Sequence, residues 1–212
     1  MKIRLERPEE HGAVENLTRE AFWNVHVPGC DEHYLVHILR DAPAFIPELD
    51  FVALEDGKLV GNILYSRAWV ARADGSRWDV ILFGPVSVLP EYQGRGVGGA
   101  LIRHTAQVAR QLGYPAIFLY GDPAYYQRFG FRPASDFGIT PPDGVPHVTL
   151  QVLPLMDGIM EGNAGRFYED PIYETIDAKD VEAFDAAFPP KEKAVTESQR
   201  RFAQLSGGDV SS

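Results

Sequence analysis

The 212-residue sequence predicts an α/β protein with a mixed, mostly antiparallel central sheet flanked by helices. Three strand patterns follow one another with only tight turns between them, which is typical of an antiparallel meander; they cover residues 50–54, 59–71 and 78–89. The last strand leads through a glycine-rich turn into an amphipathic helix over 100–112 and then a short apolar strand over 116–120. This strand–helix–strand order predicts one parallel pair in the sheet.

The chain before this meander predicts one strand and two helices. Residues 2–5 alternate between polar and apolar side chains and predict a first strand. Pro8 then opens a helix whose apolar face extends to about Phe22. Asp31 is the expected N-cap of a second helix, which ends near Arg40.

The chain after the parallel strand predicts shorter elements. Pro123 begins a short helix that Gly130 closes, and Phe131 begins another strand. Residues 136–146 are rich in proline and glycine and predict a loop. Residues 147–153 alternate well enough for a final strand.

The patterns weaken beyond residue 158. Residues 161–165 predict a turn, and residues 180–188 and 194–205 are helix candidates. Residues 206–212 are expected to fray, as chain ends commonly do.

Composition excludes several classes of protein. A formal net charge of −10 argues against nucleic acid as a main partner, and no apolar run is long enough to cross a membrane. Residues 1–6 are charged and alternating, unlike a signal peptide. The single cysteine, Cys30, rules out an internal disulfide and fits a cytoplasmic location. It is expected to be a small buried residue rather than an activated thiol.

The glycine-rich turn from Gln93 to Gly99 predicts an anion site. It leaves aligned backbone N–H groups at a helix N-terminus, with the positive end of the helix dipole behind them, and phosphate is the usual occupant. Glycine carries no Cβ that would block the phosphate or forbid a positive φ. Arg95 adds a guanidinium at the same place, whereas Arg103 is expected at the surface, facing away.

Other nucleotide sites fit this turn less well. A dinucleotide-binding fold is disfavoured because the turn follows a meander and because the next strand, residues 117–120, ends without an acidic residue. A Walker phosphate-binding loop is excluded because no Lys-Ser or Lys-Thr follows the glycines.

Two motifs together resemble the GCN5-related N-acetyltransferase (GNAT) superfamily. Gln93, Gly96 and Gly98 match the acetyl-CoA signature of that family, which is Gln or Arg, two residues, Gly, one residue, and Gly or Ala. Residues 125–131, Tyr-Tyr-Gln-Arg-Phe-Gly-Phe, resemble its tyrosine–Gly–Phe segment. With the preceding residues from Gly121, this segment most resembles the uncharacterised bacterial branch described as predicted N-acetyltransferases.

The resemblance implies a GNAT-like fold in which the parallel strands splay apart around acetyl-CoA as co-substrate. The pantetheine amides would pair with the exposed backbone of the fourth strand, as an added strand does. Gly84 and Pro85 fit this arrangement because proline interrupts a strand ladder. The implied cofactor-binding residues are Val86, Ser87, Val88, Gln93, Gly94, Arg95, Gly96, Val97, Gly98 and Gly99.

The implied reaction is direct attack of a primary amine on the acetyl thioester in a ternary complex, without a covalent enzyme intermediate. A backbone N–H near Val88 would stabilise the carbonyl oxygen. Tyr126, four residues before Gly130, would protonate the leaving thiolate, since a phenol with a pKa of about 10 is protonated at neutral pH. The general base stays open; the candidates are Glu55, Glu91, His26 and His33.

The acceptor implied is a small-molecule or peptide amine of open identity. The resemblance puts the loop and the second helix beside it, with His26, His33 and Tyr34 as substrate contacts. His33 and His37 share a helix face, but without a carboxylate at a set position they do not predict a metal site.

The resemblance covers about residues 1–155, which are expected to form the acetyltransferase domain. Residues 156–212 are expected to form a C-terminal extension that packs on this domain or on a partner subunit, and a homodimer is open. The alternative function is a non-catalytic acyl-CoA-binding or regulatory protein on the same scaffold. A third possible function is transfer of an acyl chain longer than acetyl.

Overall fold

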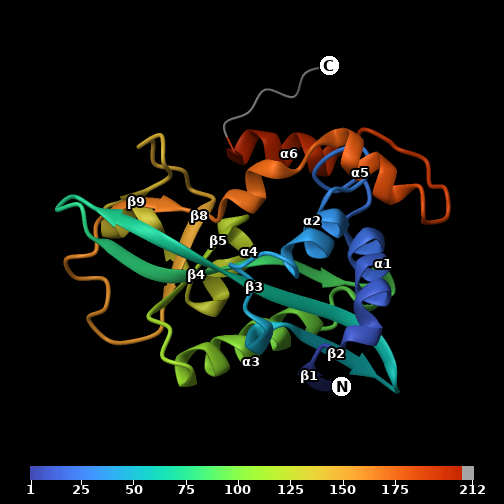
Figure 1. The fold of residues 1–212 in the computed structure, drawn as a ribbon, viewed down its shortest axis with the longest axis horizontal. Coiled ribbons are helices and arrows are strands. Elements are labelled where there is room, and N and C mark those ends of the chain that lie inside the picture. The colour runs from blue at the N-terminus through green and yellow to red at the C-terminus, as the bar shows by residue number, and fades with distance from the viewer. Residues whose placement is uncertain (207–212) are drawn as a thin grey trace.

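A computed structural model describes residues 1–206, and within them nine strands form one sheet (Figure 1). The main strand order is β1-β2-β3-β4-β5-β8-β6, while β9 pairs with β3 and β7. The strands are β1 Lys2–Leu5, β2 Phe51–Glu55, β3 Lys58–Arg72, β4 Arg77–Val88, β5 Ala116–Tyr120, β6 Arg132–Pro133, β7 Ile139–Thr140, β8 Leu150–Pro154 and β9 Gly165–Tyr168.

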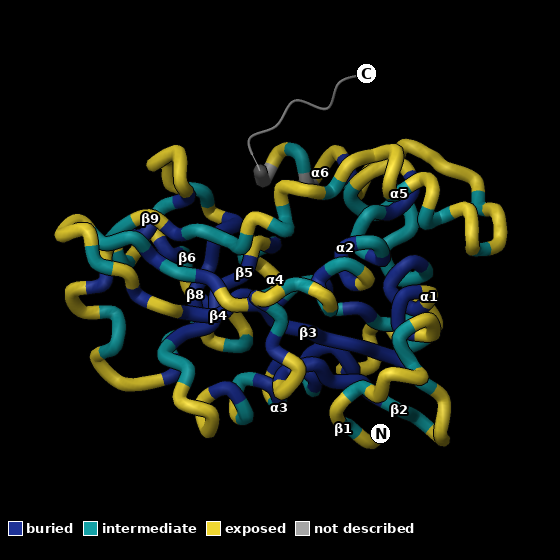
Figure 2. Tube along the Cα trace, in the orientation of Figure 1, coloured by how far each residue is buried: buried dark blue, intermediate teal, exposed yellow. Residues whose placement is uncertain are grey.

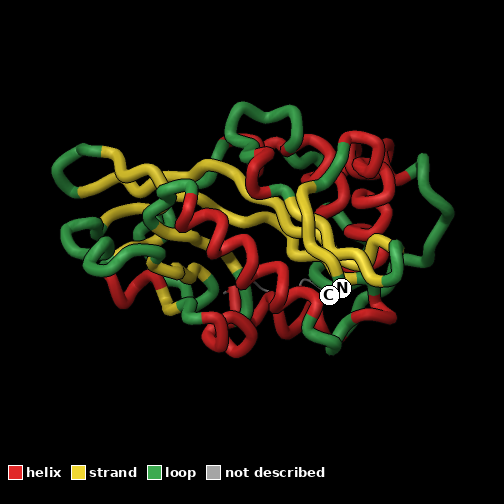
Figure 3. Tube along the Cα trace, turned by 90° about the horizontal axis from the view of Figure 1, so that it is seen from below, coloured by secondary structure: helices red, strands yellow, loops and turns green. Residues whose placement is uncertain are grey.

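Helices cover the sheet on both faces. In Figure 1, α3 lies below the strands and α1 and α2 lie above them, and the view from below in Figure 3 has α3 in front of the sheet. The helices are α1 His11–Phe22, α2 Glu32–Leu39, α3 Val97–Gln111, α4 Pro123–Tyr126, α5 Ala178–Asp185 and α6 Glu197–Ser206.

The core follows from the alternation of side chains along the strands. On β2, Phe51 and Ala53 face α3, where they meet Leu101 and Ile102, while Val52 faces the opposite side with Val14 of α1. Buried residues therefore run along β3 and β4 through the middle of the molecule (Figure 2).

The predicted fold class is confirmed. The meander β2-β3-β4 is antiparallel, and β4 and β5 form the expected parallel pair. The helix predicted over 100–112 begins earlier, at Val97, and Asp31 occupies the N-cap position of α2 without making a capping side-chain hydrogen bond.

The chain after residue 134 differs most from the prediction. The expected loop over 136–146 contains β7, and Gly165, expected to close a turn, begins β9. Strand β9 pairs antiparallel with β3 from Trp69↔Tyr168 to Arg72↔Gly165. A Cβ at Gly165 would overlap the backbone of Ala71, so this close approach requires glycine.

The C-terminal segment lies over α1 and α2 (Figure 1). Buried Arg19 of α1 bonds Asp185 of α5 through Nε at 2.5 Å, and its guanidinium lies 4.3 Å from the Trp23 ring centroid. The domain boundary expected after residue 155 stays a prediction. Of the tail expected to fray, residues 206–212, all but the first residue lie outside the described residues. No helix in the described part of the chain has the length and apolarity needed to cross a bilayer.

Candidate active site

The parallel pair opens where the site begins. Pairing of β4 with β5 covers Ile81↔Ile117 and Leu82↔Phe118, so the rest of β4 has a free edge on that side. On the other side, the register shifts by one residue between Ile63 and Tyr65, at Gly84–Pro85. This β-bulge confirms the interrupted ladder expected at Pro85.

The free edge presents the backbone of Val86 and Val88. Leu89 N–H donates to Val60 C=O at 3.0 Å, and ladder bonds in an antiparallel pair alternate along the strand. Leu89 and Ser87 therefore bond β3, which turns the amides of Val86 and Val88 to the open edge. The Gln93 side chain donates to Val88 C=O at 3.1 Å, consistent with this direction.

Ser87, expected to bind the cofactor, directs its side chain away from this edge. The side chain is fully buried, and its Oγ donates to Thr18 Oγ1 of α1 at 2.9 Å. The backbone of Ser87 bonds β3, so neither its side chain nor its backbone N–H faces the open edge of β4.

The turn into α3 leaves its first N–H groups without partners. Gly94 and Gly96 have φ values of 73° and 86°, which favour glycine, and Gly96 is the N-cap without a side-chain capping bond. The N–H groups of Val97, Gly98 and Gly99 precede the first donor of the helical ladder, Ala100 N–H, which donates to Gly96 C=O at 2.9 Å. The predicted anion site therefore has its donors in place.

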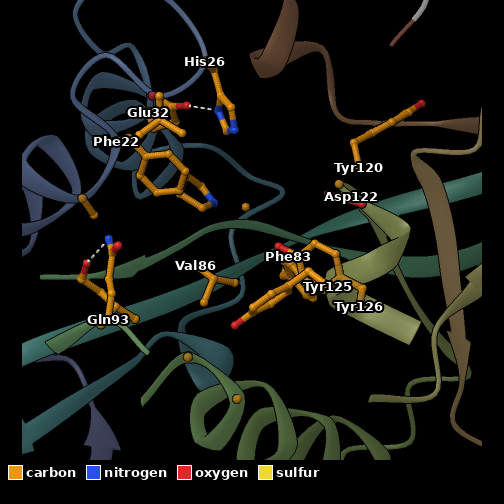
Figure 4. Close-up of a pocket in the computed structure, with 18 of the residues that line it drawn as sticks. Phe22, His26, Glu32, Phe83, Val86, Gln93, Tyr120, Asp122, Tyr125 and Tyr126 are labelled. Carbon is orange, nitrogen blue, oxygen red and sulfur yellow. Dashed lines mark hydrogen bonds and ion pairs between the residues drawn. The ribbon is translucent and has the colours of Figure 1, made fainter. Parts of the chain in front are cut away.

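Two tyrosines, Tyr125 and Tyr126, lie beside this turn. The Tyr125 hydroxyl lies over Gly98, 3.1 Å from where a Cβ would stand, and points toward Val86 (Figure 4). The Tyr126 ring packs at centroid distances of 5.7 Å from Phe83 and 4.9 Å from Tyr125. Burial, with Tyr125 and Asp122 adding to it, raises the pKa of Tyr126, so this phenol is protonated at neutral pH.

These elements enclose one cleft of about 950 Å³. The open strand, the glycine turn and the tyrosine segment form one part of its wall, which we term the donor half. The other part, which we term the acceptor half, comes from the α1–α2 region, the end of β5 and the C-terminal segment. It includes Phe22, Val25, His26, Glu32, Tyr120, Glu169, Tyr173, Ser198 and Arg201.

Arginines line the donor half. Arg103 faces the cleft, so the expectation that it faces away is wrong; it lies one helical turn after Gly99. Arg128 lines the cleft with its guanidinium 4.0 Å from the Tyr125 ring centroid. Arg95 is not among the lining residues; its guanidinium lies 5.2 Å from the Tyr92 ring centroid.

His26 and Glu32 form a pair in the acceptor half, across the cleft from Tyr125 and Tyr126 (Figure 4). His26 Nδ1 lies 2.6 Å from Glu32 Oε1. Burial acts to raise the pKa of Glu32, but the bond and charge of His26 outweigh it and lower that pKa. Cys30 is buried, as expected, and burial raises the pKa of its thiol well above the usual range.

His33 and Tyr34 do not line the cleft. His33 is fully buried, with Nε2 3.1 Å from Asp185 and its ring centroid 5.3 Å from that of Phe184. The Tyr34 ring also packs on Phe184, at 5.5 Å. Helix α5 therefore covers both side chains, and the described residues hold no cluster of His, Cys, Asp and Glu suited to a metal ion.

The C-terminal segment supplies lining residues that the sequence patterns did not reveal. Tyr173 bonds Ser66 Oγ through its hydroxyl at 2.9 Å, and Arg201 of α6 pairs with Asp122 at 2.6 Å. Burial, together with the charge of Glu174, raises the pKa of Glu169 to about 7. These residues come from the segment with the weakest sequence signals, after β9.

Comparison with known proteins fits this geometry. Residues 48–133 match the family described as "Acetyltransferase (GNAT) domain". The uncharacterized N-acetyltransferase YhbS of Escherichia coli is 30% identical over 166 residues, 78% of this chain and 93% of the relative. The chain belongs to the GNAT family. A second E. coli relative, the uncharacterized N-acetyltransferase YjhQ, is 41% identical over 113 residues, which are 53% of this chain and 62% of that relative.

Solved GNAT structures share the fold. E. coli YhbS in complex with CoA superposes with a TM-score of 0.72 at 25% identity, over 83% of this chain and 93% of that chain. A GNAT family acetyltransferase from Brucella melitensis in complex with acetyl-CoA gives 0.64 at 31% identity, over 81% and 97%. The resemblance read from residues 93–98 and 125–131 is thereby confirmed.

Proposed function

We propose that this GNAT protein transfers an acetyl group from acetyl-CoA to a primary amine by direct attack in a ternary complex. The observation that carries the proposal is the continuity of the donor half: the open β4 edge runs into an uncapped helix N-terminus within one cleft that also holds Tyr126. Relatives crystallised with CoA and with acetyl-CoA support the same donor.

The donor half fits the co-substrate in each of its parts. The Val86 and Val88 backbone would pair with pantetheine amides, and the N–H groups from Val97 to Gly99 would bind the pyrophosphate. Side chains at Gly98 or Gly99 would crowd this surface, since added Cβ atoms would stand 3.1 Å from Tyr125 and Phe129. Gln93 would fix the turn against β4 through its bond to Val88.

Cationic side chains complete this assignment. Arg103 and Arg128 would contact the phosphates, with Arg95 and Gly94 at the mouth of the turn. Both Arg103 and Arg128 line the cleft beside Phe129, with guanidinium carbons 5.6 and 5.2 Å from its ring centroid.

The chain supplies two groups to the chemistry. Acetyl-CoA, when bound, provides the thioester. The Val88 N–H would donate to the carbonyl oxygen where negative charge develops. Tyr126, kept protonated by its environment, would donate its proton to the departing sulfur.

The rest of the cleft would receive the amine. His26, which lines the acceptor half, would contact the acceptor, while His33 and Tyr34 would act by supporting α2 under α5. Residues 1–155 would form the catalytic domain, and residues after 155 would complete the acceptor half. A homodimer and a cytoplasmic location stay predictions.

Calorimetric titration with CoA and a thiol-release assay test the proposal. CoA binding is expected, with Arg103→Ala losing about 1.5–3 kcal/mol of affinity and Arg110→Ala, a change on the same helix outside the cleft, losing none. Thiol release is expected with at least one acceptor among spermidine, L-lysine and short peptides. No binding at millimolar CoA would contradict the donor assignment; binding without transfer would favour the regulatory alternative.

A further inference from the structure

Glu169 stands at the point where the C-terminal segment enters the cleft. It directly follows β9, and the pairing of Tyr168 with Trp69 of β3 fixes the backbone up to that residue. Its side chain lines the acceptor half together with Tyr120, at the end of β5, and Tyr173. The sheet itself therefore positions this carboxyl group.

Glu169 differs from the other carboxylates of the cleft. The lining residues within 1–206 include three acidic side chains, and two of them are paired: Glu32 with His26, and Asp122 with Arg201. The Glu169 carboxyl makes no hydrogen bond or ion pair with any residue of the described chain. An incoming cationic group is the partner that such a carboxyl lacks.

We infer that Glu169 is the general base that accepts a proton from the acceptor's ammonium group. The inference rests on the proposed function. An N–H bond of the ammonium breaks and an O–H bond forms on Glu169, which leaves a neutral amine whose lone pair forms the C–N bond as the C–S bond breaks. The electron pair of the C–S bond stays on sulfur, which takes a proton from Tyr126; the Glu169 proton passes to solvent and Tyr126 regains one from the acylated nitrogen.

The groups around Glu169 suit this role. Burial raises the pKa of Tyr120 and Tyr173, so these phenols are neutral where Glu169 titrates. Glu174 is the charged group whose field adds to burial and raises the pKa of Glu169 to about 7. A base with a pKa near the working pH combines a useful ionised fraction with a useful driving force.

This assignment predicts a pH dependence. The base must be ionised to work, so kcat/KM is expected to rise with pH and to level off above about pH 7. Glu174→Gln removes a negative neighbour, which lowers the pKa of Glu169, so the midpoint of this rise is expected to move to lower pH. A structural role for Glu169 would not produce that shift.

The experiment compares wild type, Glu169→Gln and Glu174→Gln, with acetyl-CoA and the best acceptor among spermidine, L-lysine and short peptides. Glu169→Gln is expected to lower kcat/KM by about 10²–10⁴-fold, to abolish the rise near pH 7, and to leave CoA affinity unchanged. Carbon-13 NMR of the glutamate carboxyls is expected to lose a resonance with a midpoint of about 7 in the same variant.

The outcomes separate the two proposals. If wild type transfers acetyl and Glu169→Gln matches its rate and pH profile, the base assignment is overturned while the proposed function stands. If wild type binds CoA but transfers acetyl to no acceptor, the proposed function fails, and the assignment fails with it. If no carboxyl resonance that titrates near pH 7 disappears in Glu169→Gln, the assignment is overturned without reference to any acceptor.

Discussion

Tyr126 and Tyr125 lie side by side, and both line the cleft. Tyr126→Phe removes the proposed proton donor and is expected to lower kcat by about 10²-fold or more without changing CoA affinity. Tyr125→Phe is the matched control, since it removes a hydroxyl over Gly98. Stopped-flow thiol release checks both variants; a large loss in Tyr125→Phe alone would move the role to that residue.

Gly121 provides the space in which the Tyr126 ring sits. A Cβ at position 121 would overlap the edge of that ring, which is itself packed on Phe83 and Phe131. Gly121→Ala is therefore expected to displace Tyr126, to cost about 1–3 kcal/mol of stability and to lower kcat. Urea unfolding together with the thiol-release assay checks this. Gly12→Ala is the control, because a Cβ at Gly12 meets open space and Gly12 has no positive φ. Gly75→Ala is unsuitable because Gly75 has a positive φ.

At the residue scale, the sequence predicted groups whose chemistry is local. Gly96 and Gly98 mark a turn by their spacing, and Tyr126 is marked by its distance from Gly130. Arg103 could have been found, because it lies four residues after Gly99 and therefore on the same helix face. Glu169 could not, because only the pairing of β9 with a strand nearly 100 residues earlier brings it to the cleft.

At the element scale, α5 is held against α1 by an ion pair between buried Arg19 and partly exposed Asp185. Arg19 is 1% exposed and bonds Asp185 at 2.5 and 3.1 Å. Burial acts to raise the pKa of Asp185, but the bond and charge of Arg19 outweigh it and lower that pKa. The ion pair thus stabilises the fold above the ordinary pKa of Asp, and this stability is lost as pH falls through the lowered value.

Asp185→Ala leaves the Arg19 cation buried without its partner. The expected cost is about 3–5 kcal/mol of unfolding free energy, measured by urea denaturation. Glu182→Ala, on the exposed face of the same helix, is expected to change stability by less than about 0.5 kcal/mol. Equal effects of the two substitutions would show that the ion pair does not hold α5.

Element length decided which strands the sequence could predict. Strands β3 and β4 are 15 and 12 residues long and carry many β-branched and aromatic residues between tight turns, so their ends were predicted within two residues. Strand β9 has four residues and begins with glycine, a turn signal in isolation. Its stability comes from ladders to β3 and β7, which no local pattern encodes.

At the scale of the whole molecule, one buried polar cluster connects five elements. Arg40, which follows α2, donates to Glu6 after β1 at 2.7 Å and to Glu15 of α1 at 3.0 Å. Asp50, before β2, accepts from Asn62 of β3 at 3.0 Å. Burial, with Asp50 adding to it, raises the pKa of Glu6 to about 9, so the Glu6–Asp50 pair holds a proton at neutral pH.

Because the pKa of Glu6 is raised in the folded protein, stability is expected to fall as pH rises. An unfolded glutamate has a pKa of about 4.3, so the stability from the protonated pair is fully present below that value and is lost as pH rises toward 9. Each pH unit in this window is expected to cost at most about 1.4 kcal/mol. Glu6→Gln carries no titrating proton and is expected to flatten this loss, as measured by urea unfolding from pH 5 to 9. Glu10→Gln is the control, since it breaks an ion pair with Arg4 outside the cluster, and it is expected to keep the wild-type slope of unfolding free energy against pH. Equal slopes in wild type, Glu6→Gln and Glu10→Gln would contradict a shared buried proton.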